Sequence, residues 1–178
     1  TYYLCKRVKK KIKKSEISFF NIIQKSKNYR KKKFITISLG GRNIKKIWEI
    51  KNWEILIKKI LNHFPNLNIK IVGSKKEKFS SEKICKINKK KIINMCGKTN
   101  INTLFNLINH SKYHLSHDDG TMHVASIFEK CGAAIFGITS EKGRWFPSNV
   151  KQRIFYPKED INEINPHKVF KAIFYDLK

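Results

Sequence analysis

Short β-rich segments alternate with amphipathic segments of helical period along most of this 178-residue chain. In segment 49–64, for example, large apolar side chains recur at helical spacing and fall on one face. Strands that alternate with helices predict a parallel sheet covered by helices on both faces. We therefore expect an α/β fold. The expected strands are 32–40, 67–74, 90–97, 112–117, 132–138 and 152–157, and the expected helices are 49–64, 77–87, 100–111, 120–130 and 165–177.

The first residues fit this alternation less well. They begin "TYYLCKRVKKKIKK", contain neither Gly nor Pro up to residue 33, and lack the apolar region and cleavage site of a signal peptide. We interpret residues 1–33 as a basic interdomain linker or the remnant of a missing amino-terminal domain. Residues 34–178 are then one domain.

Charge, apolar content and cysteine spacing limit which partners and which cellular location the chain is expected to have. Net charge is +26, which suits nucleic acid or an anionic membrane. However, 34 of the 39 basic residues are lysines scattered through every segment, whereas nucleic-acid readers favour arginine clusters and aromatic strips. A nucleic-acid-binding protein is thus the less favoured alternative, and contact with an anionic membrane stays open. No apolar run spans a bilayer and no cysteine pair has CxxC spacing, so we expect a cytoplasmic chain, with peripheral contact at the inner membrane face left open.

The segment "SHDDGTMH" (116–123) carries the densest set of reactive side chains. It joins the end of an expected strand to the start of an expected helix, where ligands bind in open α/β sheets. Free backbone N–H groups and the positive end of the helix dipole favour an anion there. The segment therefore predicts an anion-binding site.

The residues of this segment allow three other interpretations. A metal site would require His117, Asp118, Asp119 and His123 to converge, which adjacent carboxylates do not do easily, so we expect no metal. Asp118 or Asp119 could cap the helix, which is compatible with anion binding. His123 could equally be a histidine at the edge of the core.

The segment also resembles glycosyltransferase family 9, the lipopolysaccharide heptosyltransferase family, whose pattern is roughly N-D-[ST]-G-P-M-H. Four further stretches resemble family motifs in the same order: "SLGGRNIKKIW", "VGSKKE", "INMCGKTNINTL" and "GRWFP". Five ordered motifs over about residues 34 to 157 are far more specific than one. The resemblance implies a Rossmann-like parallel sheet that forms the carboxyl-terminal half of a GT-B glycosyltransferase.

The resemblance also assigns residues. Lys46 falls on the lysine that faces the donor diphosphate, and Glu77 on the acid that binds the ribose hydroxyls. Gly97 and Thr99 resemble the wall of the nucleobase pocket. The D-[ST]-G positions and the helix that follows them add the remaining substrate-binding candidates, Asp118, Asp119, Gly120, Thr121 and His123. In the family the backbone amides of the second and third D-[ST]-G residues hold the phosphates, and the Asp orients the loop or the lysine.

Three positions depart from the family pattern. Leu39 stands where Pro is usual, Asp119 replaces Ser or Thr, and Thr121 replaces Pro. Because a carboxylate is repelled by a diphosphate, Asp119 is expected to turn toward solvent or toward a lysine.

The implied function is inverting transfer of a heptose or related sugar from ADP-heptose, or another nucleotide diphosphate sugar, to a lipid-linked lipopolysaccharide core acceptor. The chain would supply the donor-binding domain, and no cofactor is implied. The missing amino-terminal domain would hold the general base, so no catalytic residue is assigned here. The alternative is a non-catalytic or degenerate nucleotide-sugar-binding module.

Overall fold

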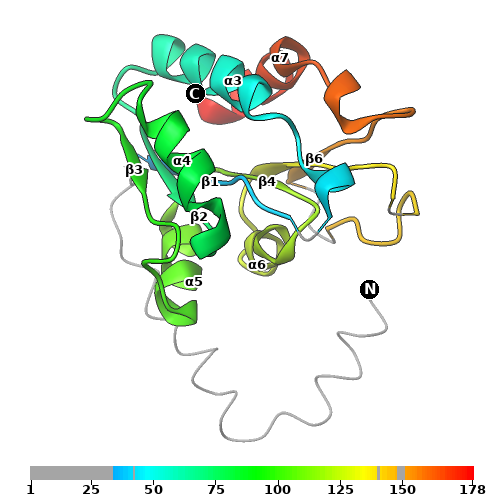
Figure 1. Cartoon of the computed structure of the whole chain (residues 1–178), viewed down its shortest axis with the longest axis horizontal. Coiled ribbons are helices and arrows are strands. Elements are labelled where there is room, and N and C mark those ends of the chain that lie inside the picture. The colour runs from blue at the N-terminus through cyan, green and yellow to red at the C-terminus, as the bar shows by residue number, and fades with distance from the viewer. Residues whose placement is uncertain (1–33, 42, 140, 148–150) are drawn as a thin grey trace, which may run out of the picture.

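A six-stranded parallel sheet forms the centre of the chain (Figure 1). The computed structural model describes residues 34–178 apart from 42, 140 and 148–150, so the predicted linker at 1–33 lies outside the described residues. The sheet order is β3-β2-β1-β4-β5-β6. The strands are β1 (Phe34–Ser38), β2 (Asn68–Val72), β3 (Ile92–Asn94), β4 (His114–His117), β5 (Gly132–Ile135) and β6 (Gln152–Phe155).

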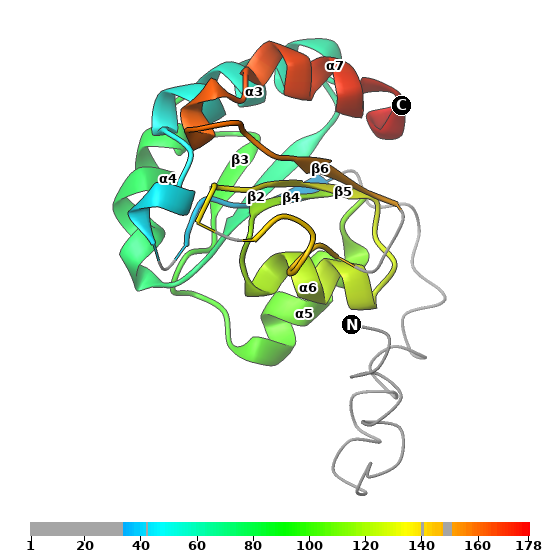
Figure 2. The same ribbon diagram turned by 90° about the vertical axis from the view of Figure 1, so that its right-hand side faces the viewer.

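Helices cover both faces of the sheet. Helices α3 and α7 pack together on one face, with α4 against α3, while α5 and α6 pack together on the other face (Figure 2). The helices are α3 (Ile50–His63), α4 (Lys78–Cys85), α5 (Ile101–His110), α6 (Gly120–Ile127) and α7 (Pro166–Leu177), with short 3-10 helices η2 (Ile44–Lys46), η3 (Lys75–Glu77) and η4 (Ile161–Glu163). This arrangement confirms the expected Rossmann-like α/β fold.

Each expected strand and helix is present, with shorter ends. The strand expected at 90–97 is the most shortened, because the chain leaves the ladder after Asn94. The Asn94 side chain accepts a hydrogen bond from the Cys96 amide at 2.9 Å, and Gly97 adopts φ of +69°. Both features turn the backbone out of the sheet.

The amphipathic pattern of segment 49–64 predicts the packing of α3 correctly. Trp53, Ile57, Ile60 and Leu61 are buried, and Ile50 packs against the same core.

Among the described residues, no helix has the length and apolar character needed to cross a membrane.

The order of the strands creates a switch point between β1 and β4. From β1 the chain builds outward through β2 and β3, then returns to place β4 on the other side of β1, with Ile37 opposite Leu115. The loops that leave the carboxyl ends of β1 and β4 therefore lead to helices on opposite faces of the sheet, α3 and α6 (Figure 2). Such a point opens the crevice in which doubly wound sheets bind ligands.

Candidate functional site

Asp119 caps helix α6 at the switch point. Its Oδ1 accepts hydrogen bonds from the amides of Thr121 (2.7 Å) and Met122 (3.1 Å) and from the Thr121 hydroxyl (2.6 Å). Its Oδ2 accepts from the Ser38 hydroxyl at the end of β1, at 2.6 Å. The predicted cap is confirmed. The expectation that Asp119 turns toward solvent or a lysine is wrong, because four donors hold the carboxylate inward.

The same bonds leave fewer open amides than the sequence suggested. The Thr121 and Met122 amides are bonded to Asp119, and the Asp119 amide donates to the His117 carbonyl at 2.9 Å. Among the described residues, none accepts a hydrogen bond from the Gly120 amide. A Cβ at Gly120 would meet no atom within 4 Å, so the first residue of α6 faces open space.

Lys46 and Asp118 form the charged centre of the site. The Lys46 ammonium, carried by η2 after β1, lies 2.7 Å from Asp118 Oδ2, after β4. The lysine side chain is 22% exposed and the carboxylate 7%. This ion pair fixes the position of the lysine ammonium where the loops after β1 and β4 meet. The structure therefore brings together two residues that the sequence assigned to one phosphate site.

Glu77 lies beside the loop that follows β1. The Ser74 hydroxyl donates to Glu77 Oε2 at 2.6 Å, and a Cβ at Gly40 would lie 2.7 Å from Glu77 Oε1. Glycine at position 40 thus leaves the room that the carboxylate occupies. The amide of Gly97 donates to the Gly73 carbonyl at 2.9 Å, and Gly73 in turn lies against Glu77. Glu77 and Gly97 therefore lie close together beyond the end of β2, with Glu77 against the loop that follows β1.

The other predicted site residues have different surroundings. Thr121 directs its hydroxyl inward, to Asp119 and to His114 Nε2 at 2.9 Å. Thr99, before α5, and His123, on α6, are half-buried. Contact of these residues with a substrate stays a prediction.

Sequence reasoning missed the polar side chains beneath α6. His114 on β4 is fully buried, with Nδ1 2.9 Å from the Thr36 hydroxyl and Nε2 on Thr121. Burial lowers the pKa of His114 to about 4 although the Asp119 charge acts in the opposite direction. Ser38, on the neighbouring strand β1, belongs to the same group because its hydroxyl donates to Asp119. Polar residues at alternate positions of two central strands were the available signal.

Both ring nitrogens of His117 form hydrogen bonds with backbone groups. Its Nδ1 lies 3.0 Å from the Gly40 carbonyl, and its Nε2 accepts from the Trp48 amide at 3.0 Å. Neither nitrogen is directed to Asp118 or Asp119. Within residues 34–178, the undescribed positions aside, no group of three or more His, Cys, Asp or Glu side chains is placed to hold a metal ion.

Comparisons with known proteins agree with the motifs. The family described as Glycosyltransferase family 9 (heptosyltransferase) matches residues 6–171. The fold is similar to that of E. coli ADP-heptose lps heptosyltransferase II, with a TM-score of 0.73 and 20% identity over 94% of this chain and 52% of that one. It is also similar to E. coli heptosyltransferase WaaC with ADP, with a TM-score of 0.76 and 13% identity over 86% of this chain and 47% of that one.

A putative UDP-N-acetylglucosamine 2-epimerase from Listeria monocytogenes is a more distant neighbour, with a TM-score of 0.60 and 11% identity over 85% of this chain and 40% of that one. No curated protein sequence matches the chain. The chain spans about half the length of the two heptosyltransferases. At these identities the solved structures show a shared fold.

Proposed function

The chain belongs to glycosyltransferase family 9, the heptosyltransferase family, and we propose that residues 34–178 supply the donor-binding domain of an inverting GT-B glycosyltransferase. The observation that carries this proposal is the Lys46–Asp118 ion pair at the switch point, beside the open Gly120 end of α6. The other half of such an enzyme would hold the acceptor site and the general base. That the chain covers 52% of one heptosyltransferase supports this division.

The proposed donor is ADP-heptose or a closely related nucleotide diphosphate sugar. One structural neighbour is described with ADP and another with ADP-2-deoxy-2-fluoro heptose. In this chain Lys46 would face the diphosphate, and Glu77, beyond the end of β2, would receive the ribose hydroxyls. Gly97 would border the base.

Transfer of the sugar releases a nucleoside diphosphate, on which negative charge develops as the glycosidic bond breaks. The Lys46 ammonium, held by Asp118 at 2.7 Å, would stabilise that charge more in the transition state than in the bound donor. The open Gly120 amide and the positive end of α6 would add to this effect. A general base in the other half of the enzyme would take the proton of the attacking acceptor hydroxyl.

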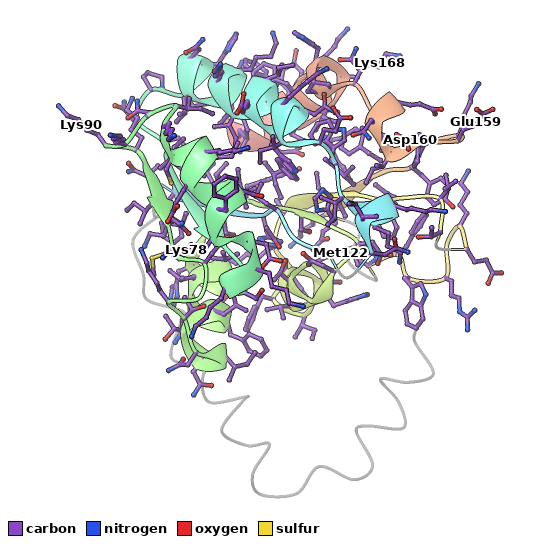
Figure 3. All side chains as sticks on the ribbon, viewed as in Figure 1. Lys78, Lys90, Met122, Glu159, Asp160 and Lys168 are labelled. Carbon is purple, nitrogen blue, oxygen red and sulfur yellow. The ribbon has the colours of Figure 1, made fainter. Side chains whose placement is uncertain are left out.

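The proposed acceptor is a lipid-linked saccharide of the lipopolysaccharide core, met at the inner face of the cytoplasmic membrane. Lys78 and Lys90 lie toward the β3 end of the sheet, and Lys168 lies on α7 (Figure 3). All three are exposed. Each lysine near an anionic leaflet contributes about 1 kcal/mol to attraction, so the net charge of +26 supports peripheral contact.

Calorimetric titration of the chain with ADP, UDP and GDP tests the donor proposal. We expect ADP to bind in the micromolar to millimolar range and more tightly than the other two. A matched variant is Gly120→Ala, whose new Cβ meets no protein atom and sits at the first helical position. Alanine there should keep or raise stability by up to about 1 kcal/mol. It should weaken ADP binding several-fold, because the methyl group occupies the space beside the open amide. Unchanged ADP affinity would place the phosphates elsewhere.

Asp119→Ser is expected to change stability and affinity in opposite directions. Serine retains a capping oxygen, but the Ser38 hydroxyl loses its carboxylate partner, so the free energy of unfolding should fall by about 1 kcal/mol. Removing one negative charge beside the predicted phosphates should tighten ADP binding several-fold. Denaturant unfolding and calorimetry measure the two effects. Weaker ADP binding in this variant would contradict the proposed position of the phosphates.

A further inference from the structure

One imidazole bridges both ends of the loop that carries Lys46. His117 is the last residue of β4, is fully buried, and packs edge-on against Trp53 with ring centroids 5.4 Å apart. The Trp48 amide can only donate, so His117 Nε2 is the acceptor of their 3.0 Å bond. In a neutral ring Nδ1 then carries the hydrogen and donates to the Gly40 carbonyl at 3.0 Å. Burial lowers the pKa of His117, which favours this neutral state.

Residues 43–47, which lie between these two anchors, are held by local hydrogen bonds. The Lys46 amide donates to the Asn43 carbonyl at 2.9 Å, and the Ile47 amide donates to the Ile44 carbonyl at 3.0 Å. The Asn43 side chain accepts from the Lys45 amide at 2.9 Å. These bonds form the short helix η2, which fixes the direction in which the Lys46 side chain leaves the backbone.

The loop also rests on the turn after β5. A Cβ at Gly137 would lie 2.5 Å from the Lys45 carbonyl oxygen and 3.0 Å from Lys46 Cα, so this backbone approach requires glycine. The loop is thus supported at both ends by His117 and from one side by Gly137. Asp118, the partner of Lys46, directly follows His117 in the chain.

We propose that His117 is a positioning residue for the diphosphate site, because it clamps the two ends of loop 40–48 and so places the Lys46 ammonium against Asp118 and the donor phosphates. The phosphate part of this inference rests on the proposed function. The clamp itself rests on contacts within the chain. A histidine that only filled the core would affect stability without affecting the loop.

Limited trypsin digestion tests the clamp without any ligand. His117→Leu keeps an apolar side chain of similar size beside Trp53 but removes both bonds. We expect cleavage after Lys45 or Lys46 to become at least about tenfold faster, since opening of this loop no longer breaks two buried hydrogen bonds. His117→Gln carries one donor and one acceptor and should stay near the wild-type rate.

Tyr113→Phe is the matched control for general destabilisation. Its hydroxyl oxygen lies 2.7 Å from the Gly132 carbonyl oxygen and 3.1 Å from Asp176 Oδ2, and it can donate its one hydrogen to these acceptors, which are away from the Lys46 loop. This variant should unfold more easily without faster cleavage after Lys45 or Lys46. Equal cleavage rates in His117→Leu and wild type would overturn the clamp. Should the leucine variant not fold, His117→Asn replaces it, because the shorter amide reaches one anchor only and must be cleaved faster than His117→Gln.

Calorimetry with ADP tests the effect on the site. His117→Leu should weaken ADP binding about tenfold, and the same substitution in a Lys46→Ala background should change it little, since coupled residues are not additive. Additive losses would show that His117 does not act through Lys46 and would overturn the positioning role. If wild-type chain binds no diphosphate, the proposed function fails, and the cleavage rates still decide the clamp.

Discussion

Lys46→Ala is expected to bind ADP about 10- to 100-fold more weakly than the wild-type chain, which corresponds to the loss of a charge-assisted contact. The substitution acts twice. It removes the ammonium that faces the diphosphate, and it leaves the Asp118 carboxylate, only 7% exposed, without the lysine that lies 2.7 Å away. An anionic ligand then meets a carboxylate that has lost this lysine. Calorimetric titration at a fixed low ionic strength measures the change.

Lys45→Ala is the matched control for Lys46→Ala. Lys45 precedes it in η2, carries the same charge and is exposed. Its removal changes the net charge equally but leaves the Lys46–Asp118 pair in place, so ADP affinity should stay within about twofold. Equal losses in both variants would mean that ADP responds to the general basic field of the chain. The proposed phosphate site would then be wrong.

The fold could be predicted because its signals are local. The spacing of apolar residues is enough to identify elements such as α3 and β4. Because the strands of a parallel sheet end at the same edge, the loops after β1 and β4 are then expected to lie near each other. The Lys46–Asp118 contact joins residues 72 positions apart, and only the resemblance to glycosyltransferase family 9 placed both residues at the donor diphosphate. The resemblance left open whether Asp118 orients the loop or the lysine, and the structure has the carboxylate 2.7 Å from the lysine.

The direction of the Asp119 carboxylate could not be predicted in this way. Electrostatic repulsion by a diphosphate suggested that it would turn outward, but the Ser38 hydroxyl that binds it comes from another strand, 81 positions away. The same holds for His117, whose two partners belong to a loop whose course is set by tertiary packing. Side-chain direction at a site depends on partners that no local pattern contains.

Stability is expected to fall by roughly 3 kcal/mol as the pH drops from about 6.5 to about 4, because His114 is buried in its neutral form. Its pKa in the folded chain is about 4, below the ordinary value of 6.5. Between these values the unfolded chain binds a proton that the folded chain does not, so the stabilising contribution is complete above about pH 6.5. It is lost progressively as the pH falls toward 4. His117, whose pKa burial also lowers, acts in the same direction.

Denaturant unfolding at a series of pH values between 7.5 and 4 measures this loss, with His114→Gln as the informative variant. Glutamine supplies one donor and one acceptor between the Thr36 and Thr121 hydroxyls but does not titrate. The variant should be less stable at pH 7.5 and have a flatter pH dependence than wild type. Asp176, whose pKa is lowered chiefly by its hydrogen bond to Arg153, loses its contribution only below its ordinary value of 3.8, outside this window. A wild-type curve as flat as that of the variant would show that His114 is not held neutral beneath α6.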